Sequence, residues 1–319
     1  MNDPPESPNS SEATAVGETG ASGKLGHEAL AALAESHVAA GRLDDAEKAI
    51  LLALKQTKEI PRYYLVLGRI WSAQNRPRQA LEAFQTAVEV EPMASPAHWR
   101  LGDFLMKKGD LHRAEVELRR AIFIDSKVSA YHSSLGALFL RQCFYDEARA
   151  SLKRAIRLDR KNPQPRIFFA ELLTSQGDRR GAEKSLEKAL ALAPASPQVL
   201  GAMCKFYEDA GRTDDAIACA RKMLERQPKN AGIHFRIGKQ LQNAGRIEEA
   251  IAAVSEARRL EPENRAYRVQ LSKLTASRDG GDSGAPNKSP DSAPPADRPA
   301  APAARGLAAK IGRLLRAKK

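Results

Sequence analysis

The residue types best suited to chemistry in this 319-residue sequence are its six histidines and three cysteines, because imidazoles and thiolates serve as metal ligands, bases and nucleophiles. Three histidines, His98, His132 and His234, are separated by 34 residues and then by three times 34 residues. No two histidines share a helical turn with a carboxylate or a cysteine, as a metal site would require. The regular spacing therefore indicates a packing role, and we expect neither a metal nor another cofactor.

The three cysteines also indicate structure rather than chemistry. Cys143 falls in an expected turn, whereas Cys204 and Cys219 fall at apolar positions of a repeating pattern. None has the paired spacing of a metal site. A disulfide between Cys204 and Cys219 is one option, but two buried thiols acting as small apolar side chains are the favoured interpretation.

A glycine-rich stretch, GETGASGK from Gly17 to Lys24, has the composition of a phosphate-binding loop without its spacing. Five residues instead of four separate Gly17 from Gly23, and Leu25 follows the lysine in place of Ser or Thr. The chain also lacks a serine-hydrolase elbow, a dinucleotide fingerprint and a paired-cysteine motif. We therefore predict that the protein is not an enzyme.

The dominant feature of the chain is a period of 34 residues, since residues 27 to 264 align with themselves seven times without insertion or deletion. The eighth position of each block is small: Ala34, Gly68, Gly102, Gly136, Ala170, Cys204 and Gly238. The twentieth is always alanine: Ala46, Ala80, Ala114, Ala148, Ala182, Ala216 and Ala250. Small residues let two helices approach closely, while large apolar residues at helical spacing fill the seam between them.

Each block is therefore expected to hold two helices joined near its fifteenth position. Five blocks carry a glycine there, which permits the backbone that ends a helix: Gly41, Gly109, Gly177, Gly211 and Gly245. Blocks two and four carry Asn75 and Cys143 instead.

With these recurring small and large residues identified, the chain resembles a tetratricopeptide repeat protein. The second block matches that family's pattern best: Tyr64, Leu67, Gly68, Trp71, Ala80, Phe84, Ala87 and Pro92. Pentatricopeptide arrays, which read RNA, have a longer period and lack this pattern of small residues. The resemblance implies an all-α fold, a right-handed superhelical α-solenoid of helix-turn-helix repeats.

The repeat register divides the chain into four parts. Residues 1–26 lack large apolar side chains and are expected to be disordered. Residues 27–277 are expected to form the array, with seven repeats and a cap helix: 27–60, 61–94, 95–128, 129–162, 163–196, 197–230, 231–264 and 265–277. Residues 278–304 read as a linker rich in Pro, Ala and Ser, and residues 305–319 as a basic amphipathic helix.

The resemblance also implies where a partner binds. In this family the first helix of each repeat lines the concave face, and positions two, five, six, nine, twelve and thirteen usually meet the ligand. We assign a partner-binding groove to these residues: Leu65, Arg69, Trp99, Arg100, Asp103, Met106, Lys107, Ser133, Ser134, Leu140, Arg141 and Phe168. The family's clamp for a peptide's terminal carboxylate is not reproduced, because its asparagines are absent. The remaining interpretation is that the groove recognises an extended or helical segment through pockets for its side chains.

Some of these assignments have an equally good structural alternative. Leu65, Ile167 and Phe168 could pack against neighbouring repeats instead of meeting a ligand. Trp99 is the better candidate contact, since an aromatic side chain supplies a large area with few rotors to freeze, and Arg100 beside it could anchor an acidic group.

The chain carries a formal net charge of +12, and both the array and the final segment are basic. One basic run lies mostly on second helices, from Arg141 to Arg166. A solvated face is the simplest interpretation, and an acidic protein, an anionic lipid or nucleic acid is the alternative. Nucleic acid is disfavoured because no aromatic residues are interleaved with this run.

The last segment forms a second candidate site, for a membrane or a partner: Leu307, Lys310, Ile311, Arg313, Leu314, Leu315 and Arg316. Its apolar residues follow the spacing of one helical face. Such a helix could bind an anionic membrane weakly, dock on a partner, or fold back into the chain's own groove.

Taken together, the sequence predicts a non-enzymatic scaffold or adaptor that binds a peptide segment of another protein in its concave groove. The alternative is a peripheral inner-membrane assembly factor held by residues 305–319, and nucleic-acid binding is less favoured. Neither a secretory signal nor a run of eighteen apolar residues occurs, so we expect a cytoplasmic protein, with attachment to the inner membrane face as the alternative.

Overall fold

A computed structural model describes residues 25–280, which form fifteen α-helices and no strand. The expectations for residues 1–24, and for the linker and basic segment beyond residue 280, lie outside the described residues. The helices are α1 His27–Ala39, α2 Leu43–Gln56, α3 Pro61–Ala73, α4 Pro77–Val90, α5 Ser95–Lys108, α6 Leu111–Ile124, α7 Ser129–Arg141, α8 Tyr145–Leu158, α9 Gln164–Ser175, α10 Arg179–Leu192, α11 Pro197–Asp209, α12 Thr213–Arg226, α13 Ala231–Asn243, α14 Ile247–Leu260 and α15 Arg265–Gly280.

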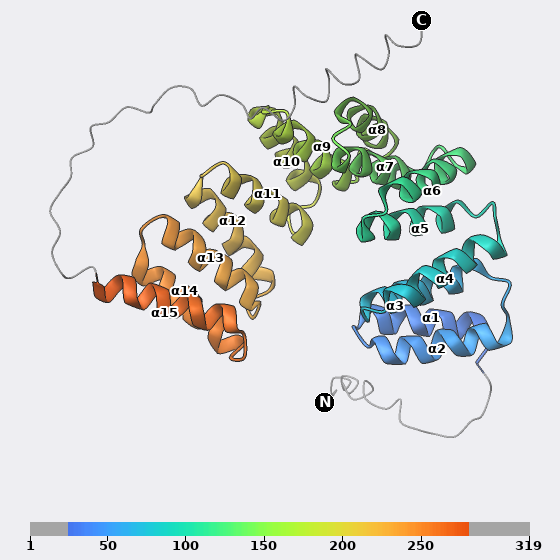
Figure 1. Ribbon diagram of the computed structural model, residues 1–319, viewed down its shortest axis with the longest axis horizontal. Coiled ribbons are helices and arrows are strands. Elements are labelled where there is room, and N and C mark those ends of the chain that lie inside the picture. The colour runs from blue at the N-terminus through green and yellow to red at the C-terminus, as the bar shows by residue number, and fades with distance from the viewer. Residues whose placement is uncertain (1–24, 281–319) are drawn as a thin grey trace, which may run out of the picture.

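The helices follow one another along a curved path, so that α1–α4 and α13–α15 lie on opposite sides of an open centre (Figure 1). The most extensive contacts join the two helices of one block, such as α5 with α6 and α7 with α8. Each pair then contacts the next pair along the chain. The predicted α-solenoid of helix-turn-helix units is therefore confirmed.

The close approach of paired helices depends on the small residues at the eighth and twentieth positions. A β-carbon added at Gly136 would lie 2.6 Å from Cγ of Leu152, and one at Gly238 would lie 2.5 Å from Cγ2 of Val254. The seven alanines of the twentieth position are at most 1% exposed. The paired helices thus meet so closely at these glycines that an added β-carbon would overlap its neighbour.

The turn inside each block has the same backbone conformation in all seven repeats. Its residue has φ between 59° and 89°, the left-handed region that β-carbons disfavour. Five of these residues are glycines, as the sequence predicted, while Asn75 and Cys143 adopt the same conformation with a side chain. The geometry of the repeat therefore imposes this turn even where the residue is unfavourable.

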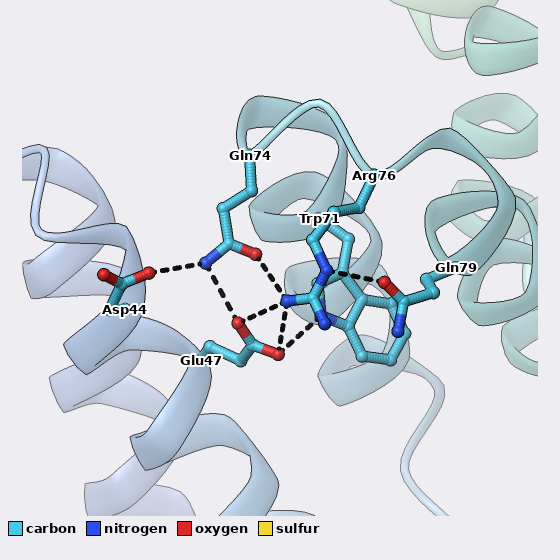
Figure 2. A network of polar contacts seen from close by, with 6 residues as sticks. All are labelled: Asp44, Glu47, Trp71, Gln74, Arg76 and Gln79. Atoms are coloured by element: carbon cyan, nitrogen blue, oxygen red, sulfur yellow. Dashed lines mark hydrogen bonds and ion pairs between the residues drawn. The ribbon is translucent and has the colours of Figure 1, made fainter.

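Polar side chains tie the first repeat to the second (Figure 2). Glu47 of α2 accepts hydrogen bonds from Nε1 of Trp71 at 2.8 Å, Nε2 of Gln74 at 2.9 Å and Nη1 of Arg76 at 2.8 Å. Burial opposes the ionisation of Glu47, but these three donors outweigh it and hold the pKa of the carboxyl below its usual value.

The same contact recurs between other repeats at the same positions. A glutamine at position fourteen meets the residue at position twenty-one of the preceding repeat in two further places, Gln142 with Glu115 and Gln176 with Arg149. Arg212 likewise pairs with Glu183 of the preceding repeat at 2.6 Å. Polar side chains therefore help to fix the stacking of repeats that the apolar core drives.

The three regularly spaced histidines also join neighbouring repeats. Nε2 of His98, His132 and His234 lies within 3.0 Å of the backbone carbonyl six residues earlier, in the preceding repeat. His98 is buried and its Nδ1 lies 2.7 Å from Glu117. The packing role is confirmed for His98, whereas His132 and His234 are only half-buried and add chiefly this hydrogen bond.

The two cysteines of repeat six are free and buried, as the favoured interpretation predicted. Sγ of Cys219 lies 3.3 Å from the carbonyl oxygen of Leu200. Sγ of Cys204 lies 3.9 Å from Sδ of Met223. Both side chains fill space between α11 and α12 as small apolar groups.

Two glycine-to-alanine substitutions should shift stability in opposite directions. Gly136→Ala should lower the free energy of unfolding by roughly 1–3 kcal/mol, because Leu152 is fully buried and cannot move away. Gly201→Ala, in α11, should raise it by up to about 1 kcal/mol, because a β-carbon there meets no atom within 4 Å and alanine favours the helix. Urea midpoints measured side by side test both values, and a shift in the same direction would contradict this account.

His98 should make stability depend on pH. The hydrogen bond to Glu117 raises the pKa of His98 above its ordinary value of 6.5, although burial works against this. The resulting stabilisation is fully present below the unfolded pKa and is lost as the pH rises through the folded pKa. The unfolding free energy of the wild type should therefore fall relative to that of His98→Gln as the pH rises above about 6.5. A difference that does not change with pH would refute this link, and the exposed His112→Gln serves as the control.

Candidate functional site

The odd-numbered helices form the inner wall of the array. From α1 to α11, each odd-numbered helix contacts the next odd-numbered one, whereas even-numbered helices lack comparable contacts with each other. Elements on the inside of a curved stack lie closer together than those outside. Figure 1 agrees for the middle of the array, since α5 and α7 lie nearer the open centre than α6 and α8. The wall is thus built from first helices, as the resemblance implied.

The residues assigned to the groove fall into three groups on α3, α5, α7 and α9. Three are exposed: Arg69, Lys107 and Arg141. Seven are half-buried: Leu65, Trp99, Arg100, Asp103, Met106, Leu140 and Phe168. Ser133 and Ser134 are buried, at 4% and 9% exposed. The apolar half-buried members pack against the core of repeats two to five. They therefore contribute to the packing of the wall as well as to its surface.

The alternative role in packing is resolved most clearly at Ile167. This side chain is 5% exposed and packs with Ala189 and Val199. Leu65 and Phe168 are half-buried, so they contribute to packing and keep part of their surface in the groove.

Trp99 lies at the centre of a polar cluster on α5 and α7. Its Nε1 donates to Oγ of Ser134 at 2.9 Å, and its ring packs on Tyr131 with the centroids 5.5 Å apart. The Arg100 guanidinium lies over the ring, 4.1 Å from the centroid. The indole N–H therefore already has a hydrogen-bond acceptor within the wall, and Arg100 covers part of the ring face.

Asp103 is a half-buried acid inside this cluster. Desolvation raises the pKa of its carboxyl, and a hydrogen bond from Ser134 with the charges of Lys107 and Arg100 only partly opposes this. Its Oδ1 is buried without a hydrogen-bond partner. A buried carboxylate oxygen without a hydrogen-bond partner lowers the stability of the fold. Asp103 is therefore a candidate for binding a partner rather than for stabilising the fold.

The wall from α3 to α7 is basic. Arg69 and Lys107 make no hydrogen bond or ion pair in the part of the chain that the structure describes. Desolvation, reinforced by the nearby charge of Arg69, lowers the pKa of Arg100. Arg141 is held by a hydrogen bond to the backbone carbonyl of Met106. This half of the wall is therefore suited to an acidic segment.

The structure adds a pocket that the sequence analysis missed. It has a volume of about 260 Å³ and lies between α9 and α11, with Glu171, Lys205 and Asp209 in its lining. These residues stand at positions nine, nine and thirteen of repeats five and six. Applying the same ligand-facing positions to the rest of repeat five and to repeat six would have identified them.

Within residues 25–280, no group of three or more His, Cys, Asp or Glu side chains could hold a metal ion. Over the same range, every helix is too short or too polar to cross a bilayer.

Two family models match the sequence. The model of the "Cilia and flagella-associated protein 70 C-terminal domain" matches residues 7–209, and the tetratricopeptide repeat model matches residues 207–273. No curated protein matches the chain by sequence.

Many solved structures share the fold, among them the following three. Yeast Tom70 has a TM-score of 0.63 at 17% identity, covering 81% of this chain and 56% of its own. A chain of the APC/C hetero-tetramer Cut9-Hcn1 has a TM-score of 0.59 at 16% identity, covering 78% of this chain and 48% of its own. A tetratricopeptide repeat protein from Parabacteroides merdae ATCC 43184 has a TM-score of 0.57 at 17% identity, covering 78% and 98%. This chain thus spans about half the length of the first two and nearly all of the third.

Removing the charge of Asp103 should stabilise the fold in a pH-dependent way. Because the folded-state pKa lies above the ordinary 3.8, the folded protein binds the proton more tightly than the unfolded chain, and stability falls as the pH rises through this range. Asp103→Asn should therefore be more stable than the wild type at pH 7, by up to about 1 kcal/mol. The difference should vanish below the unfolded pKa. Chemical denaturation at several pH values measures it, and a variant less stable at neutral pH would show that the carboxylate serves the fold.

Proposed function

Because the chain belongs to the tetratricopeptide repeat family, as its sequence predicted, we propose that it is a non-enzymatic scaffold that binds a peptide segment of another protein along its inner wall. The observation that carries this proposal is the polar cluster around Trp99. It combines a half-buried acid that has an unpaired oxygen with an arginine held on an aromatic face, and both lie on α5, one of the helices that form the inner wall. Groups that are costly for the fold and directed at a concave surface are typical of binding sites.

The chemistry of the wall favours a segment with acidic residues at the α3–α7 end. Arg69 and Lys107 are exposed and make no ion pair among the described residues, so both can pair with an incoming carboxylate. Arg100 is already positioned by its contact with Trp99, which reduces the entropy lost when it pairs with a carboxylate. Half-buried Leu140 and Phe168 offer apolar contacts further along the wall.

The scaffold role also fits the distribution of the titratable residues. The buried histidine and both buried cysteines are used for packing between helices, and ion pairs such as Arg76 with Glu47 and Arg212 with Glu183 join neighbouring repeats. These imidazole, thiol and paired charged groups, which a catalytic site could employ, thus have a structural use.

Charge reversal on the inner wall should abolish partner capture. Arg69→Glu and Arg100→Glu should each reduce the amount of the specific partner recovered with the full-length chain by about tenfold or more, because a like charge replaces an attractive one. Arg154→Glu is the matched control, since Arg154 is exposed on α8 and makes no ion pair among the described residues. Quantitative mass spectrometry of the captured proteins provides the measurement, with thermal melts to show that each variant is folded.

Equal recovery of the same partners by the wild type and by both inner-wall variants would remove the groove from this account. Loss of the partners on Arg154→Glu alone would move the binding surface to the outer helices.

A further inference from the structure

The pocket between α9 and α11 adjoins a part of repeat six that lacks large side chains at two positions of the first helix. Positions five and six of that repeat are Gly201 and Ala202. The same positions carry large side chains in the flanking repeats: Ile167, Phe168, Phe235 and Arg236. A β-carbon at Gly201 would meet no atom within 4 Å, and the small side chain of Ala202 lines the pocket itself.

The size and floor of the pocket suit one long side chain. Its volume of about 260 Å³ is below the roughly 300–1,000 Å³ of sites that hold small molecules. Ile167, Ala170 and Phe206 line its apolar part. A long aliphatic stem could lie on this surface while its polar end stays at the rim.

The rim of the pocket carries a net negative charge. Glu171 and Asp209 are carboxylates, and Lys205 is the only cation among the lining residues. None of these three side chains makes a hydrogen bond or ion pair within the described residues. Desolvation raises the pKa of Glu171, which the charge of Lys205 offsets only in part. A cation at the rim would relieve this cost.

Two hydroxyl groups add further acceptors. Oγ1 of Thr174 donates to the carbonyl of Ala170 at 2.9 Å, and Oγ of Ser175 donates to the carbonyl of Glu171 at 3.0 Å. Because their hydrogens are engaged, both oxygens present only lone pairs to an incoming group. Apart from Lys205, the polar rim therefore offers acceptors and suits a donor.

From these features we propose that the pocket receives a lysine or arginine side chain from the bound segment of another protein. The inference rests on the proposed groove and deepens it. The wall is basic from α3 to α7, through Arg69, Arg100 and Lys107, and acidic at this pocket. A segment that bears an acid at one end and a base at the other would therefore bind in only one direction.

The test measures side-chain binding directly on the full-length chain. The methyl NMR signals of Ile167, Ala170 and Ala202 report on the pocket while four probes are titrated: the N-acetyl methylamides of arginine, lysine, norleucine and glutamate. The arginine or lysine probe should shift these signals and bind about tenfold more tightly than norleucine, which has a similar stem and no charge. Glutamate should not bind.

Two variants and one control locate the effect. Ala202→Phe gives repeat six the residue that repeat five carries at this position and should fill the pocket. Glu171→Gln removes one of the two negative charges at the rim. Each should abolish the preference for the basic probes. Glu187→Gln, an exposed carboxylate on α10 of the same repeat as Glu171, should retain it.

Equal binding of norleucine, tighter binding of glutamate, or no shift with any probe would overturn the proposal. Binding of the basic probes only after residues 305–319 are deleted would show that the chain's own basic segment is the occupant, which would contradict the assignment to another protein. Failure of the groove is recognised separately, because it is read from partner capture by the Arg69 and Arg100 variants. A partner lost on those variants but retained by Ala202→Phe and Glu171→Gln leaves the groove intact and removes the pocket.

Discussion

The close approach of two helices at the eighth and twentieth positions of each repeat is the constraint on which the rest of this structure depends. Gly136 leaves no room for a β-carbon beside Leu152, and the opposing alanine column is almost fully buried. This contact sets the distance within a pair and the left-handed turn that joins its helices, which persists even at Cys143. Repetition of one pair geometry then produces the curved stack and gives it an inner wall of first helices.

The sequence predicted the fold well because every repeat obeys the same packing rule. Columns of small and large residues located the helices, the turns and the buried cysteines without reference to long-range contacts. The contacts between repeats were harder to predict. Gln74 and Glu47 stand 27 residues apart, and the glutamines of position fourteen carry no signal until the opposite column at position twenty-one is compared with them. The aligned repeat positions contain the residues that make these contacts, but only the structure shows which positions contact each other.

The candidate site was predicted in outline only. Positional rules selected the correct helices, but they could not tell that Ser134 is buried beneath Trp99 or that Asp103 has an orphaned oxygen, because both depend on how neighbouring side chains are oriented. The pocket was missed because it lies where repeat six carries a small side chain in place of a large one. Ala202 lines it and is small, whereas the flanking repeats carry Phe168 and Arg236 at the same position. In a regular array, the departures from the repeat are where binding specificity can arise.

Site-specific photocrosslinking of the full-length chain to its captured partner tests the central claim, that the inner wall is the binding surface. A benzophenone amino acid can replace Lys107 on α5 or Lys205 on α11, both exposed on the inner wall, or Lys153, which is exposed on α8 outside it. The account predicts crosslinks to the same partner from positions 107 and 205 and none from position 153. Crosslinks from position 153 with none from the two inner positions would contradict it.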